Sequence, residues 1–91
     1  RDDEDITAVS ESVFTINGNA DAKDVLEYLG EKIPDDFDYD TISAFVTKLI
    51  GHLPGDGETP EVRYENIRFT VLVAEDMRIE KIKAEIVDDH E

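Results

Sequence analysis

Aspartates at alternate positions, Asp36, Asp38 and Asp40, are the residues of this chain that most suggest chemistry. Carboxylates with this spacing begin an EF-hand loop, in which alternate side chains point at one Ca²⁺ ion. A loop starting at Asp36 would need glycine at its sixth position and glutamate at its twelfth, but Thr41 and Thr47 stand there. The three aspartates are therefore only weak candidates for Mg²⁺ or Ca²⁺ ligands.

Asp40 also directly precedes an apolar run with helical spacing. A carboxylate at that place can accept hydrogen bonds from the free amides of the first turn, and it meets the positive end of the helix dipole. We therefore expect Asp40 to be the N-cap of this helix. Asp36 and Asp38 should then lie exposed before it, and divalent cations should bind there at about millimolar strength or weaker.

The side chains that could support catalysis do not form a recognisable set. The histidines are His52, after a predicted helix, and His90, near the C-terminal end. The serines lack a Gly-x-Ser-x-Gly context, and the glycines do not form a dinucleotide or phosphate loop. Carboxylates are so numerous that a general acid and base could be chosen at will. We expect a domain that is not an enzyme.

The charge of the chain limits its partners. Nine Lys and Arg stand against 24 Asp and Glu, which gives a formal net charge of −15. Such a charge repels phosphate backbones and anionic lipids, so neither nucleic-acid binding nor direct membrane binding is expected. We predict charged tails at residues 1–5 and 88–91 around one domain of residues 6–87. The absence of cysteine excludes disulfides.

A β-hairpin and two helices are predicted in the first half of the domain. Residues 6–16 contain two β-branched runs around polar residues, as in a hairpin. The first helix is indicated by apolar residues at helical spacing, Ala22, Val25, Leu26 and Leu29. Asn19 or Asp21 could cap it, and Gly30 would end it. The second helix is indicated in the same way by Ile42, Phe45, Val46, Leu49 and Ile50, and Gly51 would end it.

The second half of the domain is predicted to form strands. In residues 67–73 an alternating pattern places one set of apolar residues on a buried face, namely Ile67, Phe69, Val71 and Val73. In the last strand, Ile79 is out of phase by one residue with Ile82 and the apolar residues that follow it. If both isoleucines face the core, a β-bulge must lie near Glu80. A further short strand could form at residues 61–64.

The predicted order is strand, strand, helix, helix, strand, strand. Because strands and helices do not alternate singly, this order favours an α+β fold in which a small antiparallel sheet packs with two helices. If the second helix buries its apolar stripe, changing Phe45 or Leu49 to alanine should cost about 2–5 kcal/mol.

Three segments of the chain, taken in order, resemble the CorC/HlyC transporter-associated domain; they are FTINGNADAKDVLEYLG, DYDTISAFVTKLIGHLPGDGE and IRFTVLVAEDMRIEKIKAEI. They are similar to that family's strand, turn and first helix, to its second helix and the turn after it, and to its closing hairpin. The similarity spans roughly residues 6–87. Ser43 and Ala44 depart from the family, which often has glycine there.

The resemblance implies an accessory domain at the C-terminal end of a longer membrane protein, on the cytoplasmic side of the bacterial inner membrane. In such proteins the domain follows a transmembrane region and a pair of CBS domains, and the proteins are described as magnesium and cobalt efflux or hemolysin-like proteins. The implied partners are the CBS pair and transmembrane region of the same protein, or a second copy in a homodimer. The family supplies no catalytic residues.

Two other hypotheses stay open. The family's fold is similar to a flavin-binding subdomain of the vanillyl-alcohol-oxidase type, so the resemblance also allows FAD or an adenosine nucleotide as ligand. The chain has no flavin motif of its own, so this idea rests on fold analogy and no cofactor-binding residues are assigned. The remaining hypothesis is a divalent-cation sensor that uses the acidic surface.

Overall fold

Five antiparallel strands and two helices make up the computed structural model, which describes residues 5–87. In chain order they are β1 (Ile6–Ala8), β2 (Val13–Asn17), α1 (Ala22–Tyr28), α2 (Ile42–Ile50), β3 (Glu61–Tyr64), β4 (Ile67–Glu75) and β5 (Arg78–Ile86). The α+β class is confirmed, but the short strand at residues 61–64 forms, so three strands and not two follow the helices.

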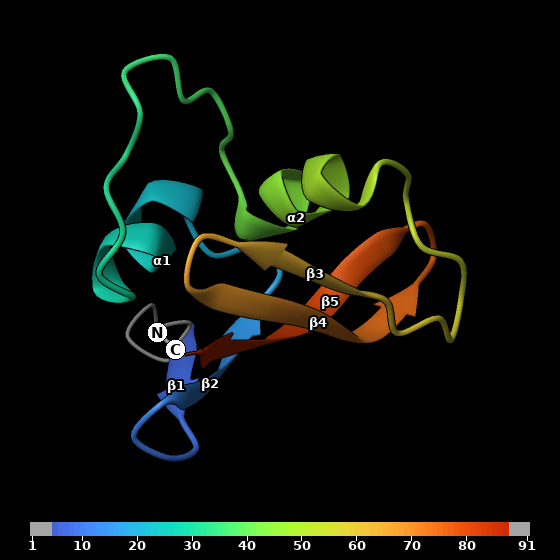
Figure 1. Ribbon diagram of the computed structural model, residues 1–91. Helices are drawn as coiled ribbons and strands as arrows, with labels where there is room; N and C mark the ends of the chain where they lie inside the picture. Colours follow the sequence, from blue (N-terminus) through green and yellow to red (C-terminus); the bar gives the residue numbers. More distant parts are fainter. Residues whose placement is uncertain (1–4, 88–91) are drawn as a thin grey trace.

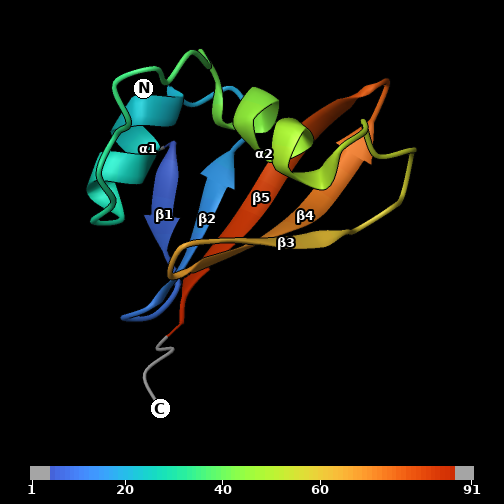
Figure 2. The same ribbon diagram turned by 45° about the horizontal axis from the view of Figure 1, so that its top comes forward.

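The sheet has the strand order β1-β2-β5-β4-β3, and every neighbouring pair is antiparallel. Both helices lie on one side of it (Figures 1 and 2). α1 lies at the β1 end of the sheet, whereas α2 contacts β3 and β5. Neither helix within residues 5–87 is long and apolar enough to cross a membrane.

The predicted tails fall largely on residues 1–4 and 88–91, which lie outside the described residues. Asp5 is described, and it does not behave as part of a tail. Its carbonyl accepts a hydrogen bond from the Asn17 amide at 2.9 Å, and its Oδ1 accepts one from the Asn17 side-chain amide at 3.3 Å. Asp5 is therefore attached to the end of β2.

The core fills the space between the sheet and the helices. Alternation along β4 directs Ile67, Phe69 and Val71 toward the helices, and these side chains are completely buried. The other strands and the helices add large apolar side chains to the same cluster, including Phe14, Ile16, Val25, Leu26, Ile42, Phe45, Val46, Ile79 and Ile82. Leu49 and Ile50 only reach its margin and are half-buried.

The predicted β-bulge near Glu80 is confirmed. Val73 pairs with Lys81, and the next residue of β4 pairs with Ile79, so Glu80 has no opposite residue. The extra residue brings Ile79 and Ile82 to the same face, where they are 3% and 0% exposed. The carbonyl of Glu80 instead accepts a hydrogen bond from the backbone of the β2–α1 turn.

A second bulge lies opposite, in β4, and it was not predicted. The pairing skips Leu72 between Val71 and Val73. The extra residue shifts the alternation by one, so Ala74 is buried while Val73 is 40% exposed. The prediction that Val73 faces the core is therefore wrong.

The ends of α1 agree with the sequence pattern. Asp21 is the N-cap, and its Oδ2 accepts a hydrogen bond from the Asp24 amide at 3.0 Å. After the helix, Gly30 has a φ of 89°, in the left-handed region. Its amide donates to the Glu27 carbonyl and the following amide donates to the Leu26 carbonyl, which is a Schellman ending.

The N-cap predicted for α2 is off by one residue. Thr41, not Asp40, has the extended cap conformation, and its hydroxyl accepts from the Ala44 amide at 3.2 Å. An Asp40 cap would need the Ile42 or the Ser43 amide, but these donate to the Ala20 and Gly18 carbonyls at 2.8 and 3.0 Å. Asp40 instead links the two helices through its backbone, because its carbonyl accepts a hydrogen bond from the Ala22 amide, the first amide of α1.

We therefore expect Thr41→Ala to lower the free energy of unfolding by about 0.5–2 kcal/mol, as for other lost N-caps. Asp40→Ala should cost clearly less, because the backbone hydrogen bond does not need its side chain. Urea denaturation of both variants checks this, with Thr41→Ser as a control that keeps the hydroxyl. A larger loss for Asp40→Ala than for Thr41→Ala would contradict the assignment.

Candidate functional site

The aspartates of residues 36–40 lie exposed on the connection between α1 and α2. The residues between them, Phe37 and Tyr39, are half-buried and pack their rings on Phe45, with centroid distances of 5.3 and 5.5 Å. The alternation thus anchors the connection to the core through its aromatic residues and directs the carboxylates outward. The sequence contained a signal for this arrangement, namely the aromatic residues Phe37 and Tyr39 between the aspartates. The interpretations of the aspartates as metal ligands or as a helix cap did not use it.

Within residues 5–87, no group of three or more carboxylate or imidazole side chains is arranged to hold a metal ion. We keep the prediction that Asp36→Asn and Asp38→Asn are nearly neutral or slightly stabilising, because each removes a charge from an acidic surface. Thermal melts check this, and calorimetric titration with Mg²⁺ and Ca²⁺ should show about millimolar binding or weaker. A site tighter than about 10 μM that both substitutions abolish would contradict it.

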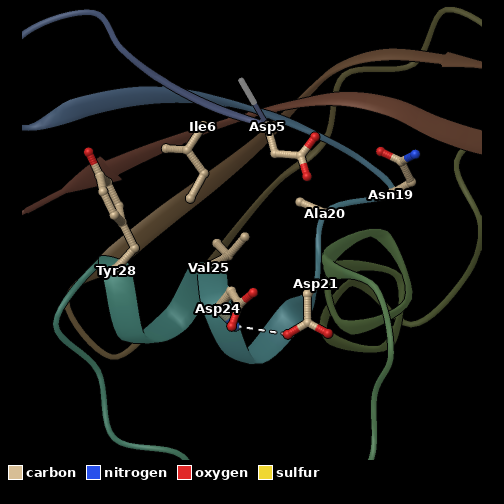
Figure 3. Close-up of a pocket in the computed structure, with 8 residues that line it drawn as sticks. All are labelled: Asp5, Ile6, Asn19, Ala20, Asp21, Asp24, Val25 and Tyr28. Carbon is tan, nitrogen blue, oxygen red and sulfur yellow. Dashed lines mark hydrogen bonds between the residues drawn. The ribbon is translucent and has the colours of Figure 1, made fainter. Parts of the chain in front are cut away.

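A cleft of about 610 Å³ lies between β1 and α1 (Figure 3). Its residues come from three short parts of the chain: the start of β1, the connection from β2 to α1, and one face of α1. They are Asp5, Ile6, Asn19, Ala20, Asp21, Asp24, Val25 and Tyr28. A volume of this size is within the usual range for ligand sites, about 300–1,000 Å³.

The floor of the cleft is apolar and its walls are polar. Ala20 and Val25 are buried at its base, and Figure 3 shows Val25 and Tyr28 rising from α1 toward β1. Tyr28 is 57% exposed, yet its ring packs edge-on against Phe14 with a centroid distance of 5.5 Å. The Tyr28 ring thus forms a solvent-exposed wall of the cleft, and its contact with Phe14 holds the ring in position.

The charges that line the cleft all have one sign. Asp5, Asp21 and Asp24 contribute carboxylates, and no lysine or arginine of the described residues lines it. The Asp5 carboxylate accepts a hydrogen bond from the Asn17 side-chain amide, and the Asp21 carboxylate accepts one from the Asp24 backbone amide. These bonds hold both carboxylates in place. The cleft can therefore accommodate an apolar chain that ends in a cation, and it would repel an anion. These residues were not predicted as a site.

Tyr64 and His52 are two further titratable groups outside this cleft. Burial raises the pKa of the Tyr64 phenol above its usual value, and the negative charges of Glu65 and Glu31 raise it further. The phenol therefore stays neutral at physiological pH. His52 lies exposed after α2, where its Nδ1 is 3.3 Å from the Leu53 carbonyl oxygen. Neither group lines the cleft between β1 and α1.

A family model described as the transporter associated domain, CorC_HlyC, matches residues 7–88 of the chain. Curated relatives include the magnesium and cobalt efflux protein CorC of Escherichia coli (strain K12) and of Salmonella typhimurium (strain LT2), each 33% identical over 88 residues. The alignments cover 97% of this chain but only 29% of each relative. The chain therefore spans less than a third of the length of these curated relatives.

Solved structures have the same fold. A hemolysin domain from Enterococcus faecalis V583 has a TM-score of 0.83 at 21% identity. The superposition covers 93% of this chain and 100% of that domain. The CorC-associated region of a putative Mg²⁺ and Co²⁺ transporter from Neisseria meningitidis MC58 has a TM-score of 0.78 at 30% identity, with 92% and 100% covered. A Xylella fastidiosa hemolysin domain, solved in complex with Mg²⁺ and Mn²⁺, has a TM-score of 0.71 at 19% identity, with 92% and 99% covered.

Proposed function

Because the chain belongs to the CorC/HlyC transporter-associated domain family, we propose that it is a non-enzymatic accessory domain that regulates ion transport through protein contacts. The proposal rests on how much of this chain and of its relatives the alignments cover. Nearly the whole chain corresponds to less than a third of proteins named for magnesium and cobalt efflux. In our proposal, a module of this size acts on transport through the rest of such a protein.

The proposed contacts are with the CBS pair and the transmembrane region of the same longer protein, or with a second copy of the domain. One structural relative is described as the transporter associated domain of a CBS domain protein, which supports this arrangement. Contacts between domains of one chain are commonly modest in area and partly polar. The charged surface of this domain suits contacts of that kind. We place the domain on the cytoplasmic side of the bacterial inner membrane.

Deleting residues 5–87 from the full-length protein tests the proposal, with export of Mg²⁺ or Co²⁺ from loaded cells as the measurement. We expect the rate of export, or its dependence on cytoplasmic ion concentration, to change while the protein still reaches the membrane. A fluorescent fusion at the other end of the protein controls for its amount and location. Unchanged export at equal protein amount would reject a regulatory role.

A divalent-cation sensor is the second candidate, and two observations favour it. The chain has a net charge of −15, and the Xylella fastidiosa relative was solved with Mg²⁺ and Mn²⁺. Calorimetric titration of the domain with each ion would show saturable heat at micromolar concentration if it senses them. The FAD hypothesis rests on fold analogy alone. Quenching of flavin fluorescence on titration with the domain would support it.

A further inference from the structure

We infer that the cleft between β1 and α1 binds an extended peptide segment, which adds to the sheet as a strand beside β1 and places a lysine or arginine side chain among the carboxylates of the cleft. The inference rests on the proposed function to the extent that both need protein contacts. It goes further by naming the contact surface and the chemistry of the partner. Three features of the structure support it.

The first feature is the outer edge of β1, which has no neighbouring strand on this side among residues 5–87. The Asp5 carbonyl and the Val9 amide form hydrogen bonds with the β2 segment, at 2.9 and 2.8 Å. Along an antiparallel strand, alternate residues direct their backbone groups at the partner. Ile6 and Ala8 therefore direct their amides and carbonyls away from β2, where an added strand could pair with them.

The second feature is the position of the cleft relative to this edge. The side chain of Ile6 points to the helix side of the sheet and lines the cleft. A residue paired beside it would direct its side chain to the same side, because neighbouring strands share their pleat about 4.8 Å apart. That side chain would enter the space between Asp5, Asp24 and the Tyr28 ring (Figure 3).

The third feature is charge complementarity. An alkyl stem suits the apolar floor of the cleft, and an ammonium or guanidinium group suits its carboxylates. The exposed face of Tyr28 can add a cation–π contact. An acidic segment would meet both these carboxylates and the net charge of −15. The occupant is therefore a basic peptide segment, not an acidic one.

The opposite edge of the sheet lacks these features. Edge strands are commonly protected by charged side chains, and β3 exposes Glu61 and Arg63. The hollow beside it is only about 190 Å³ and has charges of both signs among its lining residues. The exposed residues of β1, Thr7 and Ala8, are uncharged. The edge beside α1 is thus the better site for strand addition.

The probe for the test is an acetylated and amidated pentapeptide that alternates threonine and valine around a central lysine. Titration into the ¹⁵N-labelled domain should shift the backbone amide signals of Ile6, Ala8, Asn19 and Tyr28. Signals of β3 should stay in place. Raising the ionic strength from about 0.1 M to 1 M shortens the Debye length from about 10 to 3 Å and should weaken binding.

Two altered peptides separate the backbone from the side-chain contribution. A central glutamate should weaken binding at least about tenfold, because it opposes the carboxylates of the cleft. Methylation of the lysine's own backbone nitrogen should also abolish binding, because in an antiparallel pair the residue opposite Ile6 directs its amide at β1 and its two neighbours direct theirs away. Equal binding of all three peptides would overturn the proposal. Shifts confined to other surfaces would overturn it as well.

Two protein variants provide the matched comparison. Asp24→Asn and Asp38→Asn each remove one exposed carboxylate, but only Asp24 lines the cleft. We expect Asp24→Asn to weaken binding of the lysine peptide several-fold and Asp38→Asn to leave it unchanged. Equal weakening by both would mean diffuse attraction to an acidic surface and would reject a specific site. The spectra of the free variants show whether each is folded.

The outcome is independent of the transport experiment. Peptide binding at the cleft together with unchanged export would leave the inference standing and reject the proposed regulatory role. Altered export without peptide binding would keep that role and reject this surface.

Discussion

Replacing Gly18 by alanine is expected to lower the free energy of unfolding by about 3 kcal/mol or more, at the upper end of overpacking effects. A Cβ at this position would lie 3.0 Å from the Ile79 carbonyl carbon and would overlap with its oxygen. The obstacle is backbone, so it cannot rotate away as a side chain could. The same turn holds the bulge of β5, since the Gly18 amide donates to the Glu80 carbonyl at 2.9 Å.

Gly55→Ala is the control for this substitution. A Cβ there would have only ordinary contacts, 3.7 Å from atoms of the Glu58 side chain. We expect its unfolding free energy to stay within about 0.5 kcal/mol of the original, as for most surface changes. Urea denaturation followed by circular dichroism measures both variants. A Gly18→Ala domain as stable as the Gly55→Ala domain would show that β2 and β5 can separate at this turn without cost.

Phe45→Ala should cost about 3–5 kcal/mol, the range for truncation of a buried phenylalanine. The Phe45 side chain is 5% exposed, and it lies at the centre of an aromatic cluster. Its ring packs on those of Phe37, Tyr39 and Tyr64, with centroid distances of 5.0 to 5.5 Å, and on Phe69 at 6.4 Å. Truncation would leave a cavity between the α1–α2 connection, α2 and the sheet. A domain of this size has about 5–15 kcal/mol of stability in total, so it could lose much of it.

Leu49→Ala serves as the comparison on the same helix. The sequence pattern predicts a similar loss for both positions, but Leu49 is only half-buried. Its truncation should therefore cost about 1–2 kcal/mol, below the range for fully buried leucines. Phe45→Leu should fall between the two, because it fills part of the cavity. If Leu49→Ala proved as costly as Phe45→Ala, the aromatic cluster would not be the main support of α2.

Features that depend on neighbouring residues could be predicted from the sequence. The helices follow from apolar spacing, and their ends follow from Asp21, Gly30 and Gly51, because capping involves groups within one turn. The bulge at Glu80 was readable for a similar reason, since two isoleucines out of phase can share a buried face only if one residue is left unpaired. The order of three motifs also indicated the family.

Features that depend on contacts between distant segments could not be predicted. The sequence pattern predicted Asp40 as the cap of α2, but Thr41 is the cap, because the Ile42 and Ser43 amides that an Asp40 cap would use donate to the Ala20 and Gly18 carbonyls. Val73 fits an inward position in its own strand, but the second bulge shifts that strand by one residue. Local patterns contain no information about such pairings.

The cleft between β1 and α1 shows the same division most clearly. Its walls come from Asp5 and from Tyr28, which are separated along the chain and have no common motif. They line one cleft because the sheet places β1 at its edge and the core fixes α1 beside that edge. The sequence by itself determined the elements, their caps and the acidic charge. The tertiary packing decided which carboxylates share a cleft and which strands lie at the edges of the described sheet, because only burial of the apolar faces sets the relative positions of distant elements.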